Sequence, residues 1–462
     1  MQEKTAVFGN PLATESVQKL ILKFAIPAII SFLVSALYNI VDQIFIGQGI
    51  GMLGNAATNV AFPLTTITTA AALLLGVGSA SNFNLNMGAE KKERAAQIAG
   101  NGIFLMMSCG VILAILVIIF LHPLIWAFGA TDQVYDYAIT YTGITSLGIP
   151  FLILSTGGSQ LVRADGCPTY SMVCMLSGAV INTILDPLFI FTFQMGISGA
   201  ALATVLGQVV SGLLVVIHFF RFRSVRLNKY CFRPYRSVIR AITSLGAAAC
   251  FNQLAMCAVQ ITMNNTLTYY GGLSNYGSDI PLACVGVISK VNIVFMAFIL
   301  GISQGCQPIN GFNYGARLFH RVKRTYFTAA IAVTAISIVA FLGFQLFPRQ
   351  IVSIFGGGSE EYFHFAERYL RIFMLMTFLN GIQPLTSNFF TSIGKAKMGI
   401  MMSLTRQIIF LLPLILLFPI FFGIDGVMYA GPIADGAAAL LAFFFVFREM
   451  KQMGKSVEQK KL

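Results

Sequence analysis

Long apolar runs alternate with short polar segments along this chain, and the length of the runs indicates its architecture. A helix needs about 20 apolar residues to cross the hydrocarbon core of a bilayer. Runs bounded by Gly, Pro and charged residues predict twelve such helices, at residues 20–46, 55–82, 95–121, 134–158, 168–192, 198–222, 237–269, 281–307, 322–346, 363–388, 398–421 and 426–448. The 462-residue chain is 56% hydrophobic and 10% charged, which is outside the range of soluble domains. We therefore expect an all-α polytopic membrane protein.

The two halves of the chain resemble each other. LLGVGSASNFNLNMGA at 74–89 has a counterpart at 299–316 that also ends in Gly-Ala, DGCPTYSM at 165–172 matches IGKAKMGI at 393–400, and MGISGAA at 195–201 matches FGIDGVM at 422–428. An even number of spans per half gives both halves the same orientation, so this predicts a parallel repeat about a pseudo-twofold axis normal to the membrane. We expect two six-helix lobes, residues 1–222 and 237–462, joined by a basic linker at 223–236.

Basic residues are concentrated in alternate loops, with the densest stretch at 220–240 and further clusters at 91–94, 317–324, 395–397 and the C-terminal tail. The positive-inside rule then places both termini in the cytoplasm of a multi-pass protein of the plasma (inner) membrane. We interpret the basic stretch as contacting lipid headgroups rather than nucleic acid. No signal peptide, disulfide, metal site or cofactor is expected, and we expect a monomer.

A carboxylate interrupts the first predicted span, PAIISFLVSALYNIVDQIFIG at 27–47. Ser31, Ser35, Tyr38 or Asn39, and Asp42 recur at steps of three or four, so they share one face of a helix. An aspartate inside the hydrocarbon region costs about 2.5–3.5 kcal/mol on insertion scales, and such residues usually serve a proton, an ion or a cationic ligand. Pro27, earlier in the span, removes a backbone hydrogen bond and is a candidate helix bend.

Two further polar stripes lie in the same half. Asn182 and Asp186 are four residues apart in the fifth span, and the sixth span carries Thr204, Gln208 and Ser211 at similar steps. Three stripes in one lobe predict a shared hydrated cavity. Two carboxylates in such a cavity favour proton or cation exchange near neutral pH.

The second half lacks the acidic stripe. With a constant offset, Ser31, Ser35, Tyr38 and Asp42 correspond to Gln253, Cys257, Gln260 and Asn264, so the ionisable function is expected only in the N-terminal lobe. Lys290 and Asp435 are intramembrane charges of opposite sign and form a possible ion pair. The candidate residues for a substrate cavity are Tyr38, Asn39, Gln208, Gln253, Met256, Gln260, Asn264 and Asn380.

Together, these segments resemble the multidrug and toxic compound extrusion (MATE) family over essentially the whole chain, and within it the bacterial DinF-like branch. The resemblance implies twelve helices in two lobes and export of cationic, amphipathic compounds in exchange for H+ or Na+. It also implies a coupling network of Asp42, Asn182, Asp186 and Thr204, and a functional proline at Pro27. The NorM-like branch uses acidic residues in helices seven and ten, where this chain has Gln260, Asn264 and Asn380.

We therefore expect an antiporter that works by alternating access. The nearest alternative is a flippase for a lipid-linked substrate, but such proteins often have a more basic cavity, and Lys290 is the obvious basic candidate here. A channel is a further alternative. An intramembrane enzyme is disfavoured because His122, His218, His320 and His364 lie near span ends without clustering.

Overall fold

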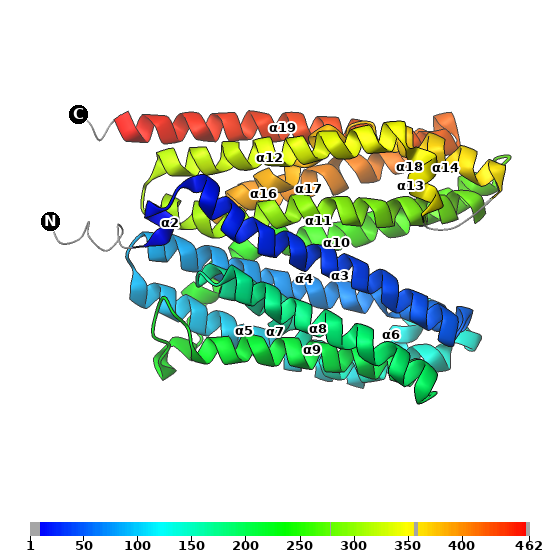
Figure 1. The fold of residues 1–462 in the computed structure, drawn as a ribbon, viewed down its shortest axis with the longest axis horizontal. Helices are drawn as coiled ribbons and strands as arrows, with labels where there is room; N and C mark the ends of the chain where they lie inside the picture. Colours follow the sequence, from blue (N-terminus) through cyan, green and yellow to red (C-terminus); the bar gives the residue numbers. More distant parts are fainter. Residues whose placement is uncertain (1–9, 278, 355–358, 459–462) are drawn as a thin grey trace.

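The computed structural model describes residues 10–277, 279–354 and 359–458, and every regular element in these ranges is a helix (Figure 1). The elements of the first half are α2 (Pro11–Thr14), α3 (Val17–Gly49), α4 (Met52–Gly88), α5 (Lys92–Ile119), α6 (Leu121–Ala127), α7 (Asp132–Ala164), α8 (Pro168–Pro187), the π-helix η1 (Leu188–Thr192) and α9 (Gly196–Phe220). The 3-10 helix η2 (Lys229–Phe232) lies in the linker.

The elements of the second half are α10 (Arg236–Gly272), α11 (Asp279–Gly315), α12 (Phe319–Leu346), α13 (Pro348–Ser353), α14 (Glu360–Phe373), α15 (Thr377–Asn380), α16 (Ile382–Ser392), α17 (Ala396–Leu404), the π-helix η3 (Thr405–Leu411), α18 (Leu412–Phe422) and α19 (Ile424–Glu458). The expected all-α polytopic architecture is confirmed. Within the described ranges, eleven helices are long and apolar enough to cross a membrane.

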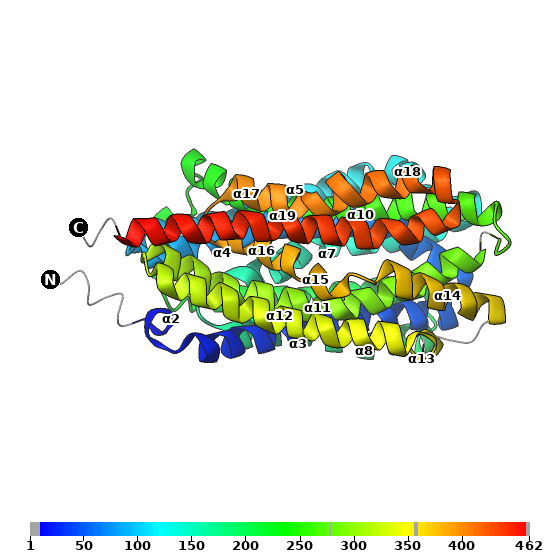
Figure 2. The ribbon, with the colours of Figure 1, turned by 90° about the horizontal axis from the view of Figure 1, so that it is seen from above.

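The predicted span at 363–388 is the exception, because it is divided among α14, α15 and α16. Figure 2 shows these three short helices following one another across the molecule. Pro384 lies in the first turn of α16, where it cannot donate a backbone hydrogen bond to the residue four positions earlier, Asn380. The helix therefore breaks at Gly381, and the span predicted as one helix is crossed in pieces.

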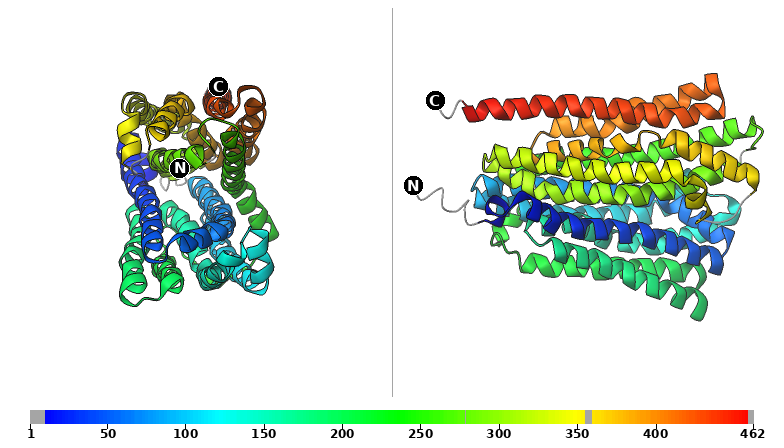
Figure 3. Two further views of the ribbon diagram at one scale, coloured as in Figure 1. Left: turned by 90° about the vertical axis from the view of Figure 1, so that its right-hand side faces the viewer. Right: turned by 45° about the horizontal axis from the view of Figure 1, so that its top comes forward.

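The helices form two groups lying side by side, and both termini emerge at the same end of the molecule (Figures 1 and 3). We call this the termini end and the opposite end the far end, and we use the names N-lobe and C-lobe for α3–α9 and α10–α19. The ribbons of the two groups lie closest at the termini end and diverge toward the far end (Figure 1).

The first helix of each half packs against helices of both halves. Helix α3 packs extensively against α11 of the C-lobe and against α8 of the N-lobe, and α10 packs against α4 of the N-lobe and α17 of the C-lobe. These contacts are equivalent under the sequence repeat. The helix that carries Asp42 is therefore shared between the two halves of the molecule.

Glycines bring the lobes into close contact at the termini end. A Cβ at Gly88 would lie 1.9 Å from the carbonyl oxygen of Phe312, and a Cβ at Gly315 would lie 2.1 Å from that of Leu85. Gly88 and Leu85 of the first Gly-Ala segment are equivalent to Gly315 and Phe312 of the second, so the two contacts are equivalent under the repeat. The backbones of α4 and α11 thus touch around a local twofold relation, as the repeat predicts.

Candidate functional site

Two aspartates of the N-lobe meet between α3 and α8. Asp186 is fully buried and lies at the end of α8, directly before Pro187 and the π-helix η1. Because α3 packs against α8, half-buried Asp42 faces Asp186, and their carboxyl groups lie within hydrogen-bonding reach of each other. Two carboxylates at this separation repel, so a proton or metal cation between them is favoured.

Asn182 and Thr204 connect this pair to α9. Asn182 is buried one turn before Asp186 on α8. In the amide orientation that satisfies both of its ends, Asn182 Nδ2 donates to Asp186 Oδ2 at 3.0 Å and its Oδ1 accepts from the Thr204 backbone N–H at 3.2 Å. The structure thus brings together all four residues predicted to form the coupling network.

Two tyrosines surround the acidic pair. Tyr38 lies one turn before Asp42 on α3, as the stripe predicts, close to both carboxylates. The other tyrosine, Tyr141 on α7, was missed by the sequence reasoning, although its hydroxyl lies close to the side chain of Thr204 and to both aspartates. The sequence offered little indication of Tyr141, because the tyrosines and threonines of the fourth predicted span do not share one face of the helix.

Some acceptors in this region lack a hydrogen-bond donor. In the part of the chain that the structure describes, Asp42 Oδ1 and Gln208 Oε1 are both buried without a partner. Gln208 lies one turn after Thr204 on α9. Buried acceptors normally have a donor, so these oxygens fit a bound proton, a cation or a ligand N–H. The site offers oxygen atoms, the ligand type that hard cations such as Na+ prefer.

The neutral candidates of the second half are distributed differently. Met256 and Gln260 on α10 line a cavity within the C-lobe, and Gln260 donates to Asn264 at 3.0 Å. Asn380 is buried on α15, whereas Asn39 is exposed and its amide donates to the carbonyl of Ser35 on its own helix.

Gln253 and Pro27 lie on the two helices shared between the lobes. Gln253 is half-buried on α10, nearly two turns before Gln260. Pro27 is buried inside α3, which continues as one helix through it, and its carbonyl accepts from Ser31 Oγ at 2.8 Å. The neighbouring residues Ala25 and Ile29 pack against glycines of α11. A bend at Pro27 would therefore move the contact between α3 and the C-lobe.

The predicted ion pair between Lys290 and Asp435 is wrong. Asp435 is paired with Arg406, which donates from Nε to Asp435 Oδ1. Arg406 is the second residue of the π-helix η3, from which it reaches α19, and the sequence reasoning overlooked it in an apolar span. Its signal was present, because an arginine inside the run 398–421 is as unusual as the aspartate it pairs with.

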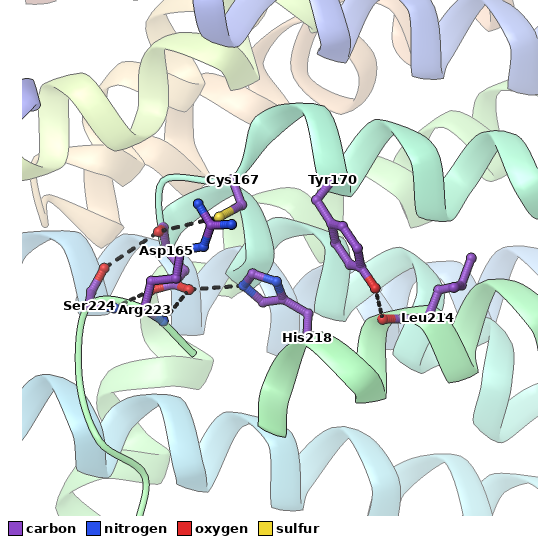
Figure 4. Close-up of polar contacts among 7 residues, drawn as sticks. All are labelled: Asp165, Cys167, Tyr170, Leu214, His218, Arg223 and Ser224. Carbon is purple, nitrogen blue, oxygen red and sulfur yellow. Dashed lines mark hydrogen bonds and ion pairs between the residues drawn. The ribbon is translucent and has the colours of Figure 1, made fainter. Parts of the chain in front are cut away.

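A second polar cluster lies at the termini end of the N-lobe and contains Asp165, Cys167 and His218, which are all buried (Figure 4). Their potential metal-ligand atoms lie within 4.8 Å of one another. Asp165 Oδ2 hydrogen-bonds His218 Nε2 at 2.9 Å and accepts from Arg223 N at 2.8 Å, while Oδ1 accepts from Ser224 N at 2.8 Å. Burial raises the pKa of the Cys167 thiol. A carboxylate satisfied by three donors beside a protonated thiol fits a clamp on the start of the linker better than a metal site.

The apolar helices, the facing acidic pair and the two helices shared between the lobes are those of a polytopic membrane protein with a polar site inside it. The MatE family model matches residues 27–188 and 248–417. This chain belongs to the MATE family of transporters, and its two matched segments follow the two halves of the repeat.

Relatives and solved structures agree with this assignment. The chain is 26% identical over 433 residues to the multidrug export protein MepA of Staphylococcus haemolyticus, covering 94% of each chain. It is 24% identical over 430 residues to MepA of Staphylococcus aureus strain MSSA476, covering 93% of each. An outward-facing multidrug resistance MATE transporter of the MOP superfamily matches with a TM-score of 0.89 at 25% identity, covering 98% of each chain. A MOP superfamily transporter from Pyrococcus furiosus also matches with a TM-score of 0.89, at 24% identity over 96% of this chain and 98% of that chain.

Proposed function

We propose that this protein exports cationic, amphipathic compounds in exchange for H+ or Na+, and that the coupling ion binds between Asp42 and Asp186. The observation that carries the proposal is that two carboxylates, buried Asp186 and half-buried Asp42, face each other, with no basic side chain paired to either in the described ranges. The names of the relatives, multidrug export proteins, support the substrate class.

The coupling follows from competition for negative charge. When both aspartates are ionised, the N-lobe cavity attracts a cationic substrate. An ion that enters from outside neutralises the pair and weakens that attraction, so substrate and ion displace each other. The carboxylate oxygens of the pair suit either a proton or Na+, and Asn182 Nδ2 holds the Asp186 carboxylate in place.

The shape of the molecule supports an alternating-access cycle. With both termini in the cytoplasm, the close contacts between α4 and α11 form the closed inner side and the diverging ends face outward. Since α3 packs against both lobes, a change of charge at Asp42 acts directly on the helix that must move when the lobes rearrange. Ion binding therefore biases the equilibrium between outward-open and inward-open states.

The test is dye efflux from liposomes containing the purified protein, with the pH and Na+ gradients set independently. Wild-type protein is expected to respond to at least one gradient, which identifies the ion. Asp42→Asn is expected to remain folded and to lose gradient-driven efflux, falling to the rate of protein-free liposomes. Asp132→Asn makes the same chemical change at an exposed position of the N-lobe and is expected to behave as wild type. Unimpaired gradient-driven efflux by Asp42→Asn would refute the proposal.

A further inference from the structure

The C-lobe contains a cavity with a charge of its own. Residues from α10, α11, α14 and η3 line it, and the space between them measures about 600 Å³, including the part open to solvent. The lining residues used below are Met256, Met263, Asn292, Tyr369, Phe373 and Arg406.

Most of the lining suits a flat apolar ligand. Tyr369 and Phe373 stack with ring centroids 5.0 Å apart at 17°, and the Tyr369 hydroxyl contacts Met263 Sδ at 3.8 Å. Met256 lies across the same cavity. Aromatic rings and flexible thioethers adapt to the faces of aromatic ligands.

Arg406 gives the cavity its polarity. The side chain of Asp435 is 1% exposed beneath Arg406, whereas that of Arg406 is 12% exposed and lines the cavity. A guanidinium has five N–H donors. Within the described ranges, Arg406 Nε donates to Asp435, and the two terminal nitrogens of the guanidinium have no hydrogen-bond acceptor. These two nitrogens are therefore available to a ligand. Asn292 Oδ1 is a buried acceptor without a donor on the same lining.

The architecture does not require this ion pair. The repeat relates 165–172 to 393–400 and 195–201 to 422–428, offsets of 228 and 227, so Arg406 corresponds to Gly178 and Asp435 to Gln208. In the N-lobe, a Cβ on Gly178 would lie 2.8 Å from the carbonyl oxygen of Gly207, so α8 and α9 meet directly through small residues. The same helix crossing is thus built without charge. In the C-lobe the arginine lies in a π-helix, a distortion that is frequent at functional sites.

We infer that the C-lobe cavity binds aromatic amphipathic compounds that carry a carboxylate, with the terminal nitrogens of Arg406 holding the carboxylate and Asn292 accepting an N–H of the ligand. A guanidinium fork matches a carboxylate in geometry, whereas its terminal nitrogens offer a ligand cation no hydrogen-bond acceptor. The N-lobe site then offers acceptors to a ligand, and the C-lobe cavity offers guanidinium donors. That such compounds are exported rests on the proposed function. That they bind in this cavity does not depend on ion coupling.

The experiment uses three probes that share a fluorophore: dansylglycine, its neutral amide, and the cationic dansyl-ethylenediamine. Each is titrated by fluorescence against the full chain in lipid nanodiscs, with empty nanodiscs as the blank and no ion gradient. We expect dansylglycine to bind about tenfold more tightly than its amide, the ratio of one charge-assisted hydrogen bond, and the cation to bind most weakly in this cavity. Equal affinities for acid and amide would overturn the inference.

Variants locate the site. Arg406→Gln combined with Asp435→Asn removes both charges and leaves neither partner buried alone, and it is expected to abolish the preference for the acid. Arg368→Gln with Asp425→Asn removes another C-lobe ion pair, one that is partly exposed, and is expected to leave the preference unchanged. An unchanged preference in the Arg406 double variant would contradict the inference.

Two further variants keep the outcome interpretable. Ser289→Phe fills the cavity without changing the ion pair and is expected to weaken binding of dansylglycine and its amide, which provides a test if the double variant fails to fold. Unaffected binding in Ser289→Phe would place the probes elsewhere and overturn the inference. Asp42→Asn is expected to keep the acid preference while losing ion-driven efflux, so failure of the coupling proposal and failure of this one are distinguishable.

Discussion

Replacement of Gly315 by alanine tests whether the close contact at the termini end holds the lobes in this conformation. A Cβ at Gly315 would lie 2.1 Å from the carbonyl oxygen of Leu85, across the boundary between the lobes. Ordinary contact begins near 3.4 Å, so α4 and α11 must separate by about 1.3 Å (3.4 minus 2.1). Backbone atoms on both helices form the contact, and neither side can relieve it by a rotamer change.

The expected magnitude follows from the cost of overpacking, about 1–3 kcal/mol when a methyl group is forced into a filled contact. Since 1.4 kcal/mol is a factor of ten, the equilibrium should shift about 5- to 150-fold away from the conformation closed at the termini end. Gly286→Ala is the matched control, because Gly286 lies on the same helix and a Cβ there meets no atom within 4 Å. Both substitutions replace a glycine of α11 by alanine, a stronger helix former.

The assay is a distance distribution between spin labels on exposed Lys92 at the start of α5 and Arg324 on α12, in a background without the eight native cysteines. Gly315→Ala is expected to populate longer distances between the lobes at this end, and Gly286→Ala to match the parent protein. Identical distributions for the two alanine variants would refute the reasoning that this glycine contact sets the conformation.

Two further predictions concern single contacts. Thr204→Val removes the hydroxyl beside the acidic pair. The loss of one hydrogen bond, about 0.5–1.5 kcal/mol, should raise the half-saturating ion concentration for efflux about 2- to 13-fold. In the control Thr183→Val the lost hydroxyl bonds its own helix, so this concentration should stay unchanged, and equal effects of the two variants would contradict the assignment. Asp165→Asn weakens the charge-assisted bonds to the backbone of Arg223 and Ser224, so hydrogen exchange at these two amides should accelerate about tenfold or more, and unchanged protection would exclude the clamp.

Much of the architecture was readable from the sequence because a bilayer imposes a fixed length on each crossing helix. The apolar runs gave eleven helices that the structure contains, and the matching Gly-Ala segments at 88–89 and 315–316 anticipated the symmetric contact between α4 and α11. The broken span was the exception. Hydropathy averages over a window, and it does not register that Gly381 and Pro384 interrupt the backbone hydrogen bonds of one turn.

The site was predictable where one helix carries the pattern. Spacing placed Asn182 beside Asp186 and Tyr38 beside Asp42, because helical periodicity fixes which side chains share a face. Spacing could not supply Tyr141, whose relation to Thr204 depends on how α7 packs against α9. It also gave Asp435 the wrong partner, because the choice between Lys290 and Arg406 depends on helix rotation, which sequence distance does not encode.

The sequence by itself determined eleven of the long apolar helices, since these follow from local composition and the thickness of a membrane. Only the tertiary structure decided that α3 and α10 are shared between the lobes, that the acidic pair faces inward across two helices, and that a guanidinium lies in the opposite lobe. These features depend on contacts between residues more than 100 positions apart, such as Asp42 with Asp186, whose geometry is set by the packing of whole helices.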